Sequence, residues 1–175
     1  MNDILEKASQ IKLVVFDVDG VLTDGSLFVG DDGEEYKAFY SRDGLGMKML
    51  QATGVEIAVI TARTSNVVIH RMESLGIKHI YQGRLEKLPA FETILQELDI
   101  RAEHAAYVGD DVIDLPVMQR TGLAIAVHDA HPFVKQHAHW QTPNKGGHGA
   151  ARDVCELIMQ AQDTLAQQFQ KFLNG

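Results

Sequence analysis

Five short and almost continuous apolar runs, most of them followed by a helical pattern, constrain the fold more than any other feature. The runs are LVVFDV (13–18), VEIAVIT (55–61), HIY (79–81), AAYVGD (105–110) and LAIAV (123–127). Strands that are apolar along their length belong in a parallel sheet covered on both faces, because a half-exposed strand alternates apolar and polar residues. The alternation of strand and helix therefore predicts an α/β fold, a Rossmann-like parallel sheet with helices on both faces.

Two regions depart from this alternation. Residues 24–42 hold two strand-like arms around the turn Gly30-Asp31-Asp32-Gly33, which predicts a β-hairpin insertion. Residues 151–173 carry apolar side chains at spacings of three and four, which predicts one long helix in a C-terminal region of residues 146–175. The segment GGHGA (146–150) comes before that helix, and its glycines predict a flexible linker.

Composition and charge exclude several classes of partner. The formal net charge is −8, which argues against nucleic acid or an anionic membrane surface, because both require a basic face. No stretch approaches the ~20 apolar residues that span a bilayer, and the first residues do not resemble a secretory signal. The single cysteine, Cys155, excludes an internal disulfide, and its apolar helical surroundings predict a core residue. We expect a single domain, residues 1–175, in the reducing cytoplasm.

Acidic residues gather where the predicted strands end. Three runs end in or are followed by the polar residues Asp17 and Asp19, Thr61, and Asp110, Asp111 and Asp114. Open α/β sheets bind ligands beyond the carboxyl ends of their strands, so these side chains are expected at one edge. Two carboxylates ~4 Å apart repel by about 4 kcal/mol at an effective dielectric of about 20, so they coexist by shifting pKa or by sharing a cation. Oxygen ligands without thiolates select a hard ion such as Mg²⁺.

The histidines offer a competing metal site. His128, His131, His137 and His139 stand at spacings that can bind zinc. Pro132 interrupts this segment, however, and neither a cysteine nor a carboxylate partner lies at ligand spacing. Solvated or helix-capping histidines are therefore the preferred interpretation.

Taken together, the acidic motifs resemble those of a known family. FDVDGVLTDG (16–25) resembles the first motif of the haloacid dehalogenase superfamily, ITAR (60–63) the second, Lys87 the third and GDDVIDLP (109–116) the fourth. Ala62 stands where glycine is common in the second motif. The resemblance is closest to a capless subgroup that dephosphorylates 3-deoxy-D-manno-octulosonate 8-phosphate (KDO 8-phosphate). It extends to the segments YSRDG (40–44), 63–77, YQG (81–83) and GGHGAARDV (146–154).

The resemblance implies a reaction and a role for each site residue. It implies Mg²⁺-dependent hydrolysis through an aspartyl phosphate, in the synthesis of lipopolysaccharide precursors. Asp17 would be the nucleophile and Asp19 the general acid and base. Thr61, the Ala62 amide and Lys87 would bind the phosphoryl group. Mg²⁺ would bind Asp17, the Asp19 backbone carbonyl and Asp110, with Asp111 and Asp114 in outer positions.

The remainder of a phosphorylated sugar acid needs further donors. The residues expected to contact the substrate are Asp19, Tyr40, Ser41, Arg42, Asp43, Gly44, Ala62, Arg63, Arg71, His79 and Lys87. The arginines in this set supply the local positive charge that an acidic protein needs to bind an anion. Arginine also suits a carboxylate because its planar fork can bind both oxygens.

The hairpin predicts an oligomer. Its arms carry Leu27, Phe28, Val29, Phe39 and Tyr40, and an isolated two-stranded hairpin is marginal in water. Pairing with other subunits would bury these side chains, so we predict a homotetramer. In it, a neighbouring subunit would cover the active site through residues 40–44 and the segment from Gly146 onward. The alternative is a hairpin that folds back on its own domain.

Two other functions stay open at this point. One is a phosphatase for nine-carbon sugar acid 9-phosphates of the KDN or sialic acid type, which would use the same chemistry. The other is a non-catalytic, tetramerising module of the same fold. The presence of all five residues that the chemistry requires argues against a scaffold: Asp17, Asp19, Thr61, Lys87 and Asp110.

Overall fold

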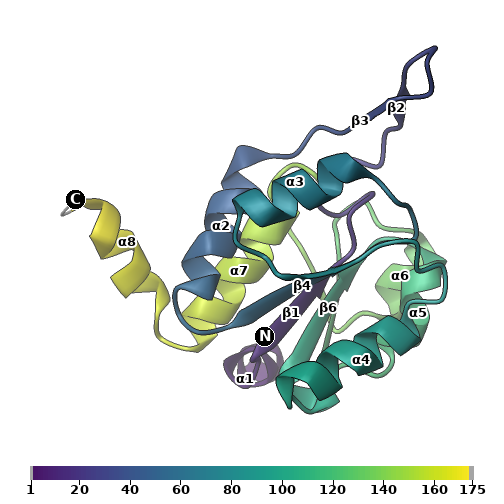
Figure 1. Ribbon diagram of the computed structural model, residues 1–175. Coiled ribbons are helices and arrows are strands. Elements are labelled where there is room, and N and C mark those ends of the chain that lie inside the picture. Colours follow the sequence, from purple (N-terminus) through teal and green to yellow (C-terminus); the bar gives the residue numbers. More distant parts are fainter. Residues whose placement is uncertain (1, 174–175) are drawn as a thin grey trace.

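A six-stranded parallel sheet organises the chain in the computed structural model, which describes residues 2–173 (Figure 1). The strand order is β5-β4-β1-β6-β7-β8. Their bounds are β1 Leu13–Phe16, β4 Glu56–Ile60, β5 His79–Tyr81, β6 Ala105–Gly109, β7 Leu123–Ala126 and β8 Trp140–Gln141. The five apolar runs form the first five of these strands, which confirms the predicted fold class. No apolar run marks β8, because that strand is two residues long.

The direction of each crossover decides which face a helix covers. From β1 the chain steps toward β5, and it then crosses back toward β8. Because crossovers between parallel strands are right-handed, steps in opposite directions place their helices on opposite faces. The first group is α2 Ser41–Gln51 and α3 Asn66–Ser74, and the second is α4 Leu88–Leu98, α5 Leu115–Met118 and α6 Pro132–His137. Short 3-10 helices span Ala102–His104 and Val112–Asp114.

The C-terminal helices complete the first face. α7 (Ala150–Ala161) packs against α2 and against α1 (Asn2–Ser9). The prediction of one long helix over 151–173 is wrong, because the chain turns after α7 and α8 (Leu165–Leu173) starts anew. Asp163 lies in this turn with a φ of 56°, a left-handed conformation that a helix interior does not contain. Within residues 2–173, the helices are all too short or too polar to traverse a lipid bilayer.

The hairpin leaves the body of the fold. β2 (Phe28–Val29) pairs with β3 (Glu35–Tyr36) in antiparallel register, as predicted, and Figure 1 shows the pair projecting away from the sheet. The amide of Gly30 donates to the carbonyl oxygen of Glu34, which closes the turn. The hairpin therefore packs little against its own subunit at its tip.

The glycines before α7 are not a flexible linker, contrary to the sequence-based expectation. A side chain on Gly146 would overlap the backbone of Gly20, and one on Gly147 would overlap the backbone of Thr23 and Asp24. The Gly147 amide also donates to the carbonyl oxygen of Val21. These glycines serve close packing, so the segment lies directly against the loop that comes after β1.

Candidate active site

The register of the sheet brings three polar residues to one edge. The last residue of β1 is level with Val59 of β4 and Val108 of β6. The next residue after each of these three strands is Asp17, Thr61 or Asp110, so the three residues lie side by side at this edge of the sheet. They line an open cavity of about 280 Å³ at the carboxyl ends of the strands. The other residues that line it are Asp19, Gly25, Leu27, Ala62, Arg63, Asp111 and Ile113.

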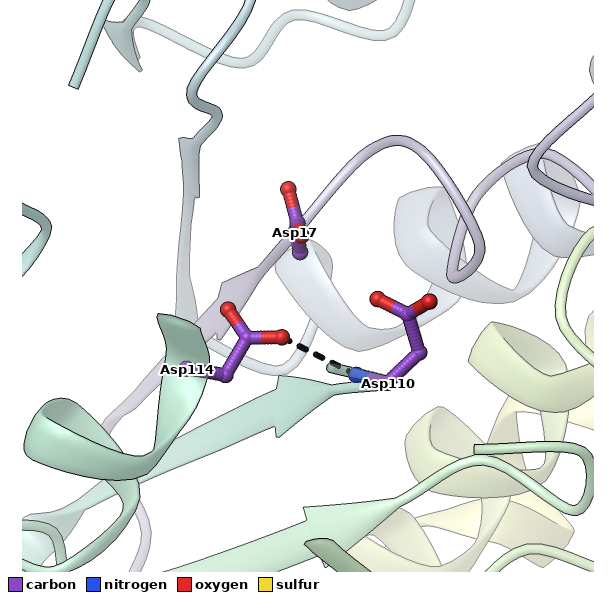
Figure 2. A group of neighbouring side chains, drawn as sticks. All are labelled: Asp17, Asp110 and Asp114. Atoms are coloured by element: carbon purple, nitrogen blue, oxygen red, sulfur yellow. Dashed lines mark hydrogen bonds between the residues drawn. The ribbon is translucent and has the colours of Figure 1, made fainter. Parts of the chain in front are cut away.

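Three carboxylates, two of them buried and one half-buried, form a group beside this cavity. Asp17, Asp110 and Asp114 each place an oxygen atom within 4.8 Å of the others (Figure 2). Burial, followed by repulsion from Asp114, raises the pKa of Asp17 to about 7 and that of Asp110 to about 8. Carboxylates crowded in this way are relieved by a shared cation. Among residues 2–173, this is the one group of three or more histidine, cysteine, aspartate or glutamate side chains whose ligand atoms all lie within 4.8 Å of one another.

Asp114 is the structural member of this group. Its Oδ1 accepts hydrogen bonds from Lys87 Nζ (2.6 Å) and from the Tyr107 hydroxyl (2.7 Å). Its Oδ2 accepts from the backbone amides of Asp110 (3.0 Å) and Asp111 (3.2 Å). Four donors occupy a carboxylate, so Asp114 fixes its neighbours and leaves the other two carboxylates for a cation. The Asp111 side chain caps the short helix that carries Asp114.

A buried ammonium lies beside the carboxylate of Asp17. Lys87 Nζ is 2.6 Å from Asp17 Oδ2 and 2.6 Å from Asp114 Oδ1, and the lysine side chain is fully buried. Burial alone would lower the pKa of Lys87, but the two carboxylates outweigh it and raise the pKa above its usual value. Lys87 therefore stays charged and can offset negative charge on a group held at Asp17.

The base of the hairpin reaches the same cavity through a chain of ion pairs. Lys37 Nζ lies 2.5 Å from Asp19 Oδ1 and 2.6 Å from Glu35 Oε1. Glu35 Oε2 in turn lies 2.5 Å from the Arg63 guanidinium. Burial alone would lower the pKa of Lys37, but the bonds to Asp19 and Glu35 outweigh it and raise the pKa. The hairpin is thus tied to two residues that line the cavity, Asp19 and Arg63.

The residues predicted for the far end of the substrate lie elsewhere in this chain. Outside the lining of the cavity are Tyr40, Ser41, Arg42, Asp43, Gly44, Arg71 and His79. Asp43 is buried, and its oxygens accept from the backbone amides of Gly149 and Arg152 at the start of α7. Burial raises the pKa of Asp43 to about 6. Within one subunit, Asp43 joins α2 to α7.

The basic members of that set also have partners in the same chain. The Arg71 guanidinium lies 6.0 Å from the Phe39 ring, and Arg42 lies 5.9 Å from the Tyr40 ring. A side chain on Gly44 would overlap the Arg71 guanidinium. His79 Nδ1 is 3.6 Å from a carboxylate of Glu97. A contact between these residues and substrate at the cavity would have to come from another subunit.

Sequence reasoning missed two residues of the site. Tyr107 is a hydroxyl in an otherwise aliphatic buried strand, and buried hydroxyls require a partner, so the sequence did carry a signal for it. Lys37 carried no such signal, because a lysine on a hairpin arm is normally solvated. Its contact with Asp19, 18 residues earlier in the chain, arises only in the folded structure.

The contacts of His131 and His139 agree with the interpretation that the sequence favoured, capping or solvated histidines. His131 Nδ1 accepts from the amide of Phe133 at the start of α6. His139 Nδ1 accepts from the amide of Ala124. These contacts are those of capping and backbone-bonding histidines, and no zinc site is needed to explain them.

Comparison with known proteins identifies the family. A profile described as haloacid dehalogenase-like hydrolase matches residues 74–153. The 3-deoxy-D-manno-octulosonate 8-phosphate phosphatase KdsC of Yersinia pestis is 46% identical over 164 residues, 94% of this chain and 88% of that protein. The chain belongs to the KDO 8-phosphate phosphatase family of haloacid dehalogenase-like hydrolases. The predicted resemblance is confirmed.

Solved structures of similar proteins share the fold over the whole chain. A probable YrbI family phosphatase from Pseudomonas syringae has a TM-score of 0.98 at 48% identity and covers 100% of this chain and 99% of its own. The KDO 8-phosphate phosphatase of Moraxella catarrhalis, solved with magnesium, phosphate and KDO, has a TM-score of 0.96 at 41% identity. That match covers 98% of this chain and 99% of the other.

The crowded carboxylates predict a pH-dependent response to magnesium. The folded-state pKa values, about 7 for Asp17 and about 8 for Asp110, lie above the ordinary aspartate value of about 3.9. Their contribution to stability is therefore complete below about pH 4 and is lost as the pH rises through about 7 and 8. Added Mg²⁺ should reverse this loss, and so raise Tm more at about pH 8.5 than at about pH 6.

Thermal unfolding in chelator and in Mg²⁺ at the two pH values measures this effect. Asp110→Asn is the matched control, because it removes one charge and keeps the shape. It should flatten the pH dependence and reduce the gain from Mg²⁺. A gain that is equal at both pH values and survives in Asp110→Asn would show that Mg²⁺ binds elsewhere.

Proposed function

We propose that this chain is a Mg²⁺-dependent phosphatase that hydrolyses KDO 8-phosphate to KDO and phosphate. The observation that carries the proposal is the environment of Asp17, a buried carboxylate held against a buried ammonium and facing a second carboxylate. A relative 41% identical over 98% of the chain was crystallised with magnesium, phosphate and KDO. We place the reaction in the cytoplasm, in the synthesis of lipopolysaccharide precursors.

The acidic group fits a magnesium ion. Asp17 and Asp110 offer carboxylate oxygens, and the backbone carbonyl of Asp19 offers a third hard ligand. The pKa values of Asp17 and Asp110 are raised, as expected of crowded carboxylates that a bound cation would stabilise. When bound there, Mg²⁺ would neutralise phosphate and carboxylate charge and so let two anions approach each other.

The residues of the chain divide the reaction between them. A carboxylate oxygen of Asp17 forms a bond to phosphorus while the bond from phosphorus to the sugar oxygen breaks, giving an aspartyl phosphate. Lys87, the Thr61 hydroxyl and the Ala62 amide hold the phosphoryl oxygens. Asp19 gives a proton to the departing sugar oxygen. It then takes a proton from the water that attacks phosphorus, which releases phosphate and restores Asp17.

Asp17→Asn tests the nucleophile. An amide of the same shape cannot form the acyl phosphate, so turnover should fall by roughly 10³-fold or more, with the fold intact and cooperative unfolding retained. The measurement is phosphate release from a panel of phosphorylated sugars and sugar acids, with and without chelator. Turnover near the wild-type rate in Asp17→Asn or in chelator would contradict the mechanism. Preference for a nine-carbon 9-phosphate would change the substrate and leave the chemistry standing.

Arg63 is the proposed donor for the substrate carboxylate. Its side chain is 44% exposed at the cavity and pairs with Glu35. A substrate carboxylate could share or replace that partner, because a guanidinium presents five donors in a planar fork. The contact would lie away from the phosphoryl group, where it can select among substrates.

Arg63→Ala should therefore act selectively. Loss of one charge-assisted contact costs about 1.5–3 kcal/mol, or roughly ten- to a hundred-fold in kcat/KM for KDO 8-phosphate. p-Nitrophenyl phosphate lacks the remote carboxylate and should lose much less. Arg101→Ala, an exposed arginine paired with Glu103, is the control and should change neither value. Equal losses on both substrates would assign Arg63 to the phosphate or to the fold.

We also propose that the chain forms a homotetramer through its hairpin. The apolar side chains of the hairpin are 53% to 61% exposed in one subunit: Leu27, Phe28, Val29 and Tyr36. A patch of this kind on a projecting element favours association over folding back. In the tetramer, a neighbouring subunit would cover the open cavity with residues 40–44 and the part of its chain that follows α7, because the glycines at 146 and 147 are packed against their own subunit.

Light scattering at micromolar concentration tests the assembly. The wild type should have four times the subunit mass of 19.4 kDa. Phe28→Asp should yield smaller particles, because it buries a charge in the interface. Phe133→Asp, at an exposed phenylalanine on α6, is the control and should stay assembled. A monomeric wild type would refute the tetramer.

A further inference from the structure

Lys37 is a buried charge at the base of the exposed hairpin. Its side chain is 1% exposed, while the side chain before it, Tyr36, lies on the exposed face of β3. The sequence assigned Lys37 no role. A lysine is buried at this level only where carboxylates replace its hydration.

The partners of Lys37 are one residue of the reaction and one of the hairpin. Lys37 Nζ lies 2.5 Å from Asp19 Oδ1 and donates a hydrogen bond to it. On its other side lies Glu35, which also contacts the Arg63 guanidinium. Glu35 therefore holds the Lys37 side chain in place, and the Lys37 ammonium contacts the Asp19 carboxylate.

The Asp19 carboxylate has fewer partners to hold it in place than the Asp17 carboxylate has. Asp17 is held by Lys87 and by the amide of Val18. Within residues 2–173, the Asp19 carboxylate has Lys37 as its only hydrogen-bond partner, and it is 20% exposed. Without Lys37 its side chain could turn toward solvent. Each aspartate of the pair thus has its own buried lysine, one from the body and one from the hairpin.

We propose that Lys37 is a positioning residue that holds the Asp19 carboxylate where the leaving group departs. This inference rests on the proposed function, in which Asp19 protonates that group. It gives the hairpin a second task beside assembly, because the same element carries the apolar faces and the lysine. Displacement of a catalytic group by about 1 Å can reduce a rate by roughly 10²-fold.

The dependence on leaving group tests this inference. Phenyl phosphate and 4-nitrophenyl phosphate have nearly the same shape, but phenolate is the more basic leaving group and needs a proton more. In Lys37→Met, kcat/KM should fall roughly ten- to a hundred-fold for phenyl phosphate, and at least about tenfold less for the nitro ester. Purely structural damage would lower both values by the same factor.

The controls separate this inference from the proposed function. Lys48→Met, at an exposed lysine on α2, should keep the wild-type ratio between the esters. A wild type that hydrolyses neither the esters nor KDO 8-phosphate would refute the proposed function itself. A wild type that hydrolyses both, with equal losses in Lys37→Met, would refute only the role of Lys37.

A second variant covers the case in which Lys37→Met does not fold. Glu35→Gln keeps the shape of the hairpin and removes one of the two charges that hold Lys37. The ratio between the esters should shift in the same direction by a smaller factor, with cooperative unfolding retained. An unchanged ratio in folded Glu35→Gln, beside an unfolded Lys37→Met, would overturn the inference.

Discussion

The arrangement of the site depends on a buried ammonium between two buried carboxylates. Lys87 contacts both Asp17 and Asp114 at 2.6 Å, far from solvent. Breaking such a pair strands a buried charge, which typically costs about 3–5 kcal/mol, so the three side chains are obliged to stay together. Asp114 also accepts from the Tyr107 hydroxyl and from two backbone amides, so together with Lys87 it joins the end of β6 and the start of α4 to the end of β1.

The net negative charge of the carboxylates around Lys87 determines which ligands this site can bind. Burial, followed by repulsion among three carboxylates that one ammonium cannot neutralise, raises the pKa values of Asp17 and Asp110. A divalent cation completes the balance, and a phosphate can then approach. The fold supplies a firm frame for these charges because Asp17 and Asp110 directly follow β1 and β6, two neighbouring and fully buried strands.

Features with a local pattern could be predicted from the sequence, whereas features that depend on a distant contact could not. The buried strands, the acids at their ends and the hairpin all have local signatures. The break between α7 and α8 has none, because the apolar spacing runs through it and aspartate at Asp163 merely tolerates the left-handed conformation. Lys37 and the structural role of Asp43 depend on partners that only the fold brings near. Tyr107 is the exception, since a lone hydroxyl in a buried strand can be recognised from the sequence.

The fit of Gly146 and Gly147 against the loop after β1 limits the space into which that loop can shift. That loop is clamped between the sheet and a segment far along the chain, with no room for a side chain at the contact. Any thickening of the segment before α7 would push on the loop that carries Asp17 and not on the surface. Substitutions at Gly146 or Gly147 would therefore act on the loop that follows Asp17, although these glycines lie far along the chain from it.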